Sequence, residues 1–148
     1  MTKPNTLFSY GLVFVQLVCL GLIALTGPLF AANPVLLPLE GAAGFLGLWA
    51  IWTMGIGNFN VAPDVKTGAR LVTGGPYRYI RHPMYSALLL GGLTLVLDYF
   101  STFRLAIWLL LVIVLLFKLS YEEKLLAQTL DGYAAHMRQT KRLIPLVY

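Results

Sequence analysis

Long apolar stretches constrain this chain more than any other feature. The first, residues 7–25, contains no Asp, Glu, Lys or Arg, and about 20 apolar residues are enough for a helix to cross the hydrocarbon core of a bilayer. Further apolar segments run over residues 39–57, 84–97 and 103–119. Of the 148 residues, 58% are hydrophobic and 11% charged, so few charges remain to cover a soluble globule. We therefore predict an all-α polytopic membrane protein with about four transmembrane helices.

The order of these segments indicates one domain over residues 1–148. Residues 1–57 hold two spans, and residues 58–148 hold a polar loop, a helical hairpin and a C-terminal helix. A cleavable signal peptide is the alternative interpretation of the first segment, but its apolar run exceeds the roughly 7–15 residues of such a signal. In the second span Ala43 and Gly47 stand four residues apart, a spacing that lets another helix approach closely.

The fourth apolar segment is followed by a polar stretch with helical periodicity. Its larger apolar side chains and one alanine fall on one face, as in an amphipathic helix: Leu126, Leu130, Tyr133, Ala134 and Met137. We therefore expect the fourth helix to continue without a break into an amphipathic C-terminal helix. Such a helix lies on the membrane or packs against it.

Positive charge is distributed unevenly between the two sides that alternating spans would create. Arg104 falls on one side. Ten basic residues fall on the other: Lys3, Lys66, Arg70, Arg78, Arg81, Lys118, Lys124, Arg138, Lys141 and Arg142. Since loops rich in Lys and Arg stay in the cytoplasm, we predict a multi-pass protein of the bacterial inner membrane with both termini cytoplasmic. The net charge of +5 then favours anionic membrane lipids over nucleic acid as partners.

Two common kinds of site are not expected in this sequence. Cys19 is the single cysteine, and His82 and His136 are the two histidines, so no metal site is predicted. Gly55-Ile56-Gly57 lies in an apolar span with no strand before it, so it does not mark a dinucleotide-binding Rossmann sheet.

Polar residues gather in two clusters on the predicted cytoplasmic side. Residues 75–85 read Gly-Pro-Tyr-Arg-Tyr-Ile-Arg-His-Pro-Met-Tyr, and residues 121–124 read Tyr-Glu-Glu-Lys. If the third and fourth segments form an antiparallel hairpin, both clusters meet at one membrane face and enclose a polar pocket with an apolar floor. Taken separately, the arginines also suit lipid phosphates and the tyrosines suit interfacial anchoring. Glu122 and Lys118 likewise suit an exposed ion pair.

The string at residues 75–85 resembles the Arg-His-Pro-x-Tyr motif of the isoprenylcysteine carboxyl methyltransferases and phospholipid methyltransferases, a group of integral membrane enzymes. In that group a helical hairpin, a Glu-Glu pair and a C-terminal pattern follow the motif. Similar elements stand here at Glu122, Glu123, Asp131-Gly132-Tyr133, Arg142 and Pro145. The resemblance extends over residues 65–145 and leaves the first two spans without a specific match.

This resemblance implies methyl transfer from S-adenosyl-L-methionine at the membrane face. The implied acceptor is lipophilic or small, with an isoprenylcysteine-type carboxylate, a thiol or an amine as its reacting group. The implied cofactor contacts are Tyr77, His82, Tyr85, Glu122, Glu123 and Tyr133. The candidate catalytic residues are Arg81, Lys118 and Arg142. Because the chain is compact, part of the acceptor tunnel is either missing or supplied by a neighbouring protomer of a homo-oligomer.

Three departures from the group's pattern bear on the acceptor more than on the cofactor: Ser86-Ala87 in place of glycine, Lys118 in place of arginine, and His136 in place of tyrosine. Two other functions stay open on sequence alone. Membrane reductases of the sterol-reductase type also carry a resembling Arg-His-Pro-x-Tyr and bind NADPH. A non-catalytic four-span protein is the second alternative, although transport requires polar residues at mid-membrane.

Overall fold

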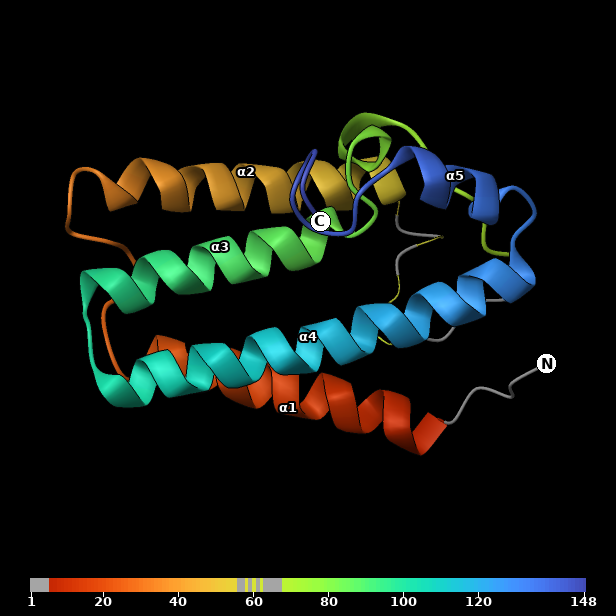
Figure 1. Ribbon diagram of the computed structural model, residues 1–148. Helices are drawn as coiled ribbons and strands as arrows, with labels where there is room; N and C mark the ends of the chain where they lie inside the picture. The colour runs from red at the N-terminus through yellow and green to blue at the C-terminus, as the bar shows by residue number, and fades with distance from the viewer. Residues whose placement is uncertain (1–5, 56–57, 59, 61, 63–67) are drawn as a thin grey trace.

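The computed structural model describes residues 6–55, 58, 60, 62 and 68–148, and within them the chain is helical (Figure 1). Its elements are α1 (Thr6–Leu25), α2 (Leu36–Met54), the short 3-10 helix η1 (Gly75–Arg78), α3 (Pro83–Asp98), α4 (Thr102–Thr129) and α5 (Tyr133–Gln139). The described residues form no β-strand, and their one isolated bridge joins Ile80 to Lys141. The predicted all-α fold without a Rossmann sheet is confirmed. Lys3, Lys66 and Gly57, which entered the sequence predictions, lie outside the described residues.

Three of the helices are long and apolar enough to cross a membrane. These are α1, α2 and α4, with 20, 19 and 28 residues. The helix α3 is also apolar but has 16 residues, which at 1.5 Å per residue gives a length of about 24 Å. The structure is therefore that of an integral membrane protein with three to four apolar helices.

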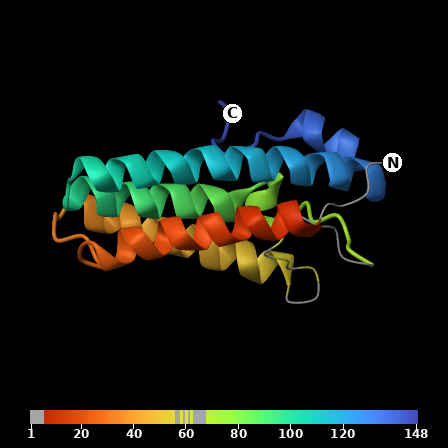
Figure 2. The same cartoon turned by 90° about the horizontal axis from the view of Figure 1, so that it is seen from below.

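The helices run side by side as two pairs (Figures 1 and 2). The helix α2 packs along α3, and α1 packs along α4, while α3 also contacts α4. The contact between α2 and α3 is close because it is made by small residues. A Cβ on Gly47 would lie 3.4 Å from the Cβ of Ala87, and a Cβ on Gly91 would lie 3.6 Å from that of Ala43. The predicted close approach at Ala43 and Gly47 is confirmed.

A compact apolar core joins α1, α3 and α4. Its fully buried members are Cys19, Ile23, Val96, Leu111 and Leu115. Among the described residues, no such buried apolar core joins α2 directly to α1. Residues of both helices instead line a cavity, which is described below.

The C-terminal helix departs from the sequence prediction. The helix α4 continues without a break past residue 119, as expected, but it ends at Thr129. Gly132 then adopts a left-handed conformation with φ of 81°, which glycine tolerates because it has no Cβ. The predicted single amphipathic helix through residues 126–137 is therefore wrong. Because the chain turns at Gly132, α5 places Tyr133 and His136 in buried positions.

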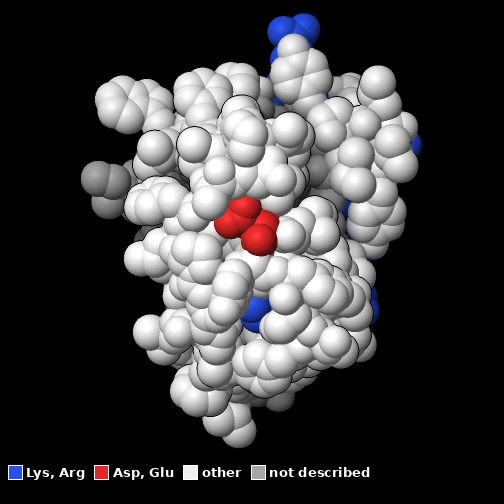
Figure 3. All heavy atoms as spheres, turned by 90° about the vertical axis from the view of Figure 1, so that its left-hand side faces the viewer, with Lys and Arg blue, Asp and Glu red and all other residues white. Residues whose placement is uncertain are grey.

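Charge differs strongly between the two ends of the bundle. The loops at residues 26–35 and 99–101 lie at one end, and the N-terminal side of α1, η1 and α5 lie at the other (Figure 1). Figure 3 views the first end and shows small acidic and basic spots on an otherwise uncharged surface. Most described basic residues lie at the second end: Arg70, Arg78, Arg81, Lys124, Arg138, Lys141 and Arg142. The spans alternate as the charge argument assumed, while the side that faces the cytoplasm stays a prediction.

Arg104, the basic residue of the first end, ties three helices together. Its side chain is 1% exposed, and it donates to the carbonyl oxygens of Ile23 at 2.7 Å and Leu95 at 2.9 Å and to Thr26 Oγ1 at 3.1 Å. Ile23 and Leu95 lie in the last turns of α1 and α3, where the helix dipole carries partial negative charge. The Leu95 carbonyl also accepts from the backbone N–H of Tyr99 at 3.3 Å. The arginine therefore stabilises both helix ends.

We expect Gly27→Ala to destabilise the bundle by about 1–3 kcal/mol, the usual cost of overpacking. The added Cβ would lie 2.4 Å from one Arg104 guanidinium nitrogen. The guanidinium is held by its hydrogen bonds and cannot move without losing them. Thermal unfolding of purified protein in detergent measures the effect. Gly21→Ala is the matched control, because no atom lies within 4 Å of its added Cβ. Equal melting temperatures for Gly27→Ala and the unmodified protein would contradict this role of Arg104.

Candidate functional site

The Arg-His-Pro segment is held in place by a tight turn against α2. The 3-10 helix η1 begins at Gly75, whose φ is 53°. A Cβ there would lie 2.5 Å from Thr53 Oγ1 and 3.2 Å from Trp49 Nε1, so a side chain would push the turn away from α2. His82 then precedes the first residue of α3, Pro83, a position where proline is favoured. The sequence therefore directs the motif to the mouth of α3.

The C-terminal segment pairs with this motif as a short extended stretch. The backbone N–H of Arg81 donates to the carbonyl of Lys141 at 2.8 Å, and the N–H of His82 donates to that of Arg142 at 3.1 Å. Ser86 Oγ donates to the carbonyl of Leu143 at 2.6 Å. These bonds fix the chain after α5 across the start of α3.

Glu123 lies at the centre of a buried ionic network. Its carboxylate is 3% exposed and accepts from Arg81 Nε at 2.6 Å and from Arg142 Nε at 3.0 Å. His82 Nε2 lies 3.4 Å from the same carboxylate. The Arg81 guanidinium also donates to the carbonyls of Met137 and Thr140. Glu123 therefore joins α4 to the motif and to the C-terminal segment.

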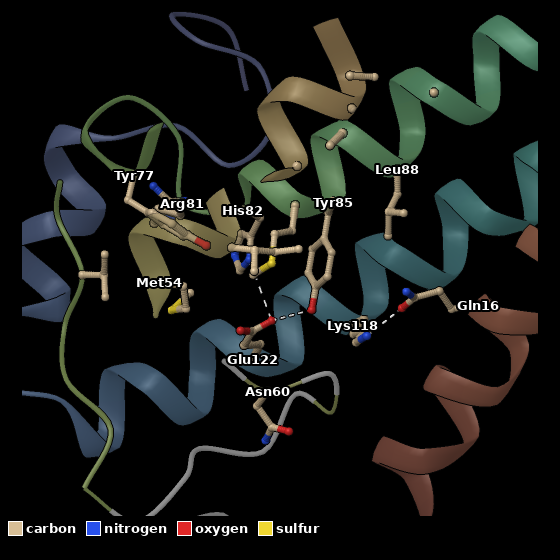
Figure 4. Close-up of a pocket in the computed structure, with 18 of the residues that line it drawn as sticks. Gln16, Met54, Asn60, Tyr77, Arg81, His82, Tyr85, Leu88, Lys118 and Glu122 are labelled. Carbon is tan, nitrogen blue, oxygen red and sulfur yellow. Dashed lines mark hydrogen bonds and ion pairs between the residues drawn. The ribbon is translucent and has the colours of Figure 1, made fainter. Parts of the chain in front are cut away.

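Glu122, the adjacent carboxylate, has a different environment (Figure 4). Tyr85 donates its hydroxyl to Glu122 Oε2 at 2.7 Å, and His82 Nδ1 lies 3.8 Å from the same oxygen. The His82 and Tyr85 rings stack with centroids 5.3 Å apart and an angle of 4° between their planes. A quarter of the Glu122 side chain is exposed, and it lines the large cavity described next.

A cavity of about 940 Å³ lies between the helices, a volume in the range of small-molecule sites. One part is bounded by polar side chains of η1, of the segment that joins η1 to α3, and of α3, α4 and α5. We call it the polar chamber: Tyr77, Arg81, His82, Tyr85, Lys118, Glu122, Tyr133 and His136. The other part runs between α1, α2 and α3, and we call it the apolar groove: Leu20, Ile23, Ala24, Leu37, Gly41, Gly44, Gly47, Leu88, Gly91 and Leu95. The site thus combines a polar end with a long apolar extension.

Four buried polar atoms of the chamber have no hydrogen-bond partner among the described residues. They are the hydroxyls of Tyr77 and Tyr133 and the Nε2 atoms of His82 and His136, and each of these residues is at most 7% exposed. His82 Nε2 lies near the Glu123 carboxylate, whereas the other three atoms have no such neighbour. Buried polar groups are nearly always bonded in native structures. The cavity therefore offers these atoms to a bound polar molecule.

The same burial changes the pKa values of these groups. Loss of hydration raises the pKa of both Tyr77 and Tyr133 well above the ordinary value, and the nearby glutamates raise it further. Burial, together with the Arg81 charge, lowers the pKa of His136. The two tyrosines are therefore neutral hydrogen-bond donors, and the neutral form of His136 is favoured.

Lys118 and Gln16 lie where the polar chamber meets the apolar groove. Lys118 Nζ donates to Gln16 Oε1 at 2.6 Å and lies 5.2 Å from the centroid of the Tyr85 ring. Figure 4 shows the Gln16 side chain reaching from α1 toward Lys118 on α4. Both side chains are buried, with 6% of Gln16 and 1% of Lys118 exposed.

The structure brings the sequence-predicted residues together in one place. Seven of them line the cavity: Tyr77, Arg81, His82, Tyr85, Lys118, Glu122 and Tyr133. The other two, Glu123 and Arg142, are absent from its lining and belong to the ionic network. The prediction that residues 75–85, at the start of α3, lie close to the Glu-Glu pair of α4 is confirmed by their positions in the structure. The chemical roles of these residues stay predictions.

Sequence reasoning missed Gln16 and the contribution of α1. A glutamine in the middle of an uncharged span was the available signal, because polar side chains inside membrane helices usually face a functional interior. Met54 and Asn60 also line the cavity and gave no comparable signal.

The donor set favours an organic ligand over a metal. No group of three or more His, Cys, Asp or Glu able to hold a metal ion occurs in the described part of the chain. The chamber instead offers one accepting carboxylate, two unused phenol hydroxyls and a stacked aromatic pair. That set suits a polar molecule with several hydrogen-bonding groups and a planar ring.

The family model described as phospholipid methyltransferase matches residues 35–131, which is well over half of the chain. The matched range covers α2, η1, α3 and α4 and leaves α1 and α5 outside. No curated protein sequence matches the chain.

Proposed function

The chain belongs to the phospholipid methyltransferase family, and from that premise we propose that it transfers a methyl group from S-adenosyl-L-methionine to a lipophilic acceptor at the membrane face. The observation that carries the proposal is the cavity of about 940 Å³, in which a polar chamber opens into an apolar groove. A polar methyl donor and a lipophilic acceptor need such a combination of surfaces.

The polar chamber fits the donor through groups that keep hydrogen-bonding or stacking capacity toward the cavity. The hydroxyls of Tyr77 and Tyr133 lack partners among the described residues, and Glu122 keeps accepting capacity toward the cavity. A carboxylate suits ribose hydroxyls or an ammonium group, and the stacked rings of His82 and Tyr85 suit a planar base or a cation. When bound, S-adenosyl-L-methionine would supply an electrophilic methyl group on a sulfonium centre.

We assign different tasks to the two glutamates and their partners. Glu122, Tyr77, His82, Tyr85 and Tyr133 would contact the cofactor directly. Arg81, Arg142 and Glu123 would act as positioning residues, because their charged groups bind one another. Transfer to an anionic acceptor needs little proton movement, so catalysis would rest on orientation and exclusion of water.

The length of α4 supports a site at the membrane surface. Glu122 follows Thr102 by 20 residues, which is about 30 Å along a helix and equals the usual thickness of the hydrocarbon core. The polar chamber would thus lie at one edge of the core, with the apolar groove extending into it. From the charge distribution we propose that this edge is cytoplasmic and that the membrane is a bacterial inner membrane.

Titration of purified protein with S-adenosylhomocysteine tests the cofactor assignment. We expect saturable binding in the micromolar to low millimolar range by isothermal titration. We also expect a rise in melting temperature with S-adenosyl-L-methionine and none with NADPH, because only a true ligand of the folded state stabilises it. Absence of S-adenosylhomocysteine binding at millimolar concentration would contradict the proposal. A melting shift with NADPH alone would favour a reductase.

A further inference from the structure

The apolar groove follows one face of α2 over most of the length of this helix. Five of the residues that line the cavity recur there every three or four positions: Gly41, Gly44, Gly47, Ile51 and Met54. Gly41 and Met54 are 13 residues apart, which is about 20 Å along a helix and some two thirds of the roughly 30 Å of a hydrocarbon core. Met54 lies at the polar chamber (Figure 4). The groove therefore leads from the chamber toward the opposite end of the bundle.

Two of the α2 glycines make no close contact with another helix among the described residues. Gly47 approaches Ala87 of α3, whereas a Cβ on Gly41 or on Gly44 would have no atom within 4 Å. Glycine destabilises a helix interior relative to alanine, and it suits positions where a ligand must come close to the backbone. Both glycines line the cavity. Their missing side chains therefore leave room inside the groove for a ligand.

The loop that joins α1 to α2 bounds the far end of the groove. Phe30 of this loop lines the cavity, and the next backbone N–H, that of Ala31, donates to Glu40 Oε2 at 2.7 Å. Asp98 accepts from the two N–H groups that follow, at 3.0 and 2.8 Å. Glu40 also lines the cavity, and contact with hydrocarbon would remove water from its carboxylate at a cost in free energy. An apolar ligand is therefore accommodated from the chamber as far as the level of Glu40.

We propose that Gly41 and Gly44 determine the acceptors of this enzyme, by admitting a long apolar tail that runs from the polar chamber along α2 and ends at Glu40. This inference rests on the proposed function and adds the class of the acceptor to it: a long-chain molecule rather than a small one. The chemical identity of the reacting group does not enter the inference, because the two glycines lie along the tail.

Bilayer lipid is the alternative occupant of the groove. If lipid chains fill it, a side chain added at either glycine affects acceptors of every length alike. An acceptor tail instead makes the effect depend on position. A side chain at Gly44 obstructs each tail that passes this point, while one at Gly41, about a turn farther from the chamber, obstructs longer tails only. Chain length therefore distinguishes the two occupants.

The test uses the full chain in lipid nanodiscs with S-adenosylhomocysteine present and empty discs as the blank. The probes are N-acylglycines, alkanethiols and alkylamines, each as a series of even-numbered chains from octyl to octadecyl. We expect the unmodified protein to bind at least one series. For each probe, the dissociation constant of a variant is divided by that of the unmodified protein at the same mole fraction in the lipid. Partition of the probe into the bilayer is equal for both proteins and cancels in this ratio.

Gly44→Leu should leave the octyl probe unaffected and weaken binding of the hexadecyl probe about 10- to 100-fold, the usual effect of overpacking. Gly41→Leu should give the same weakening with an onset at a longer chain. Glu40→Gln keeps an oxygen for the Ala31 N–H but removes the charge, so the octadecyl probe should bind more tightly. Gly11→Leu is the matched control, because Gly11 has the same open surroundings and is absent from the cavity lining. The S-adenosylhomocysteine affinity of every variant should change less than threefold, within the scatter of remote substitutions.

Several results would overturn the inference. A Gly44→Leu ratio that is the same at every chain length assigns the groove to bilayer lipid. An onset in Gly41→Leu at the same or a shorter chain than in Gly44→Leu contradicts the course of the tail along α2. An unchanged octadecyl ratio in Glu40→Gln removes the carboxylate as the end of the groove. If the unmodified protein binds S-adenosylhomocysteine but none of the probes, the groove holds no acceptor tail. If it binds no S-adenosylhomocysteine, the proposed function itself fails, and this outcome is separate from the chain-length result.

Discussion

Glu122→Gln should weaken S-adenosylhomocysteine binding about 10- to 100-fold, the effect of losing one charged hydrogen bond. Glu122 is the carboxylate that lines the polar chamber, where it accepts from Tyr85 at 2.7 Å. A glutamine can still accept that hydrogen bond through its amide oxygen, so the local packing is retained. The loss should therefore appear in cofactor affinity, measured by isothermal titration, and not in folding.

Asp131→Asn is the matched control for Glu122→Gln. It makes the same exchange of carboxylate for amide at an exposed position just after α4. Both variants should melt within a few degrees of the unmodified protein, and Asp131→Asn should keep its affinity. Unchanged S-adenosylhomocysteine binding in Glu122→Gln would remove the carboxylate from the cofactor site.

The meeting of the two polar clusters could be predicted from the sequence. A short third segment and a tight connection after it imply an antiparallel hairpin. An antiparallel hairpin returns the start of α3 and the far part of α4 to the same level. His82 and Glu122 are thus brought together by chain direction and length alone. The small residues Ala43 and Gly47 likewise predicted a close contact between two helices.

The division of labour between Glu122 and Glu123 could not be predicted in this way. Adjacent residues on a helix point about 100° apart, so only one of the two can face the cavity. Which one does so depends on the rotation of α4, and that rotation is set by packing against α1 and α3. It also depends on where Arg142 lies, and the docking of the C-terminal segment beside Ile80 has no periodic signal.

The ending of α4 was missed for a related reason. Apolar residues continue at helical spacing through residues 126–137, and that pattern favours one helix. Asp131-Gly132 is a turn signal inside the same stretch, and it determines the structure because it lets α5 bury Tyr133 and His136. The buried contacts that the chain gains by turning at this point outweigh the helical periodicity of its apolar residues.

Glu123→Ala should be the most destabilising single change at the site, with a loss of about 3–5 kcal/mol, the usual effect of removing one partner of a buried ion pair. The substitution leaves Arg81, whose side chain is 8% exposed, without its carboxylate at 2.6 Å. Arg142 loses contacts at 2.9 and 3.0 Å. The C-terminal segment should then detach from the start of α3. Thermal unfolding in detergent and limited proteolysis after residue 139 measure the two effects.

A double variant separates this cause from loss of packing. Glu123→Leu with Arg81→Leu removes the carboxylate together with the more buried of its two arginine partners, so less unpaired charge remains in the interior. It should be more stable than Glu123→Leu alone, as a thermodynamic cycle over the two sites would register. If Glu123→Ala has the same melting temperature as the unmodified protein and its C-terminal segment stays protected from protease, the ionic network does not hold the Arg-His-Pro segment in place. Glu123 would then be free for the direct cofactor contact that the sequence had predicted.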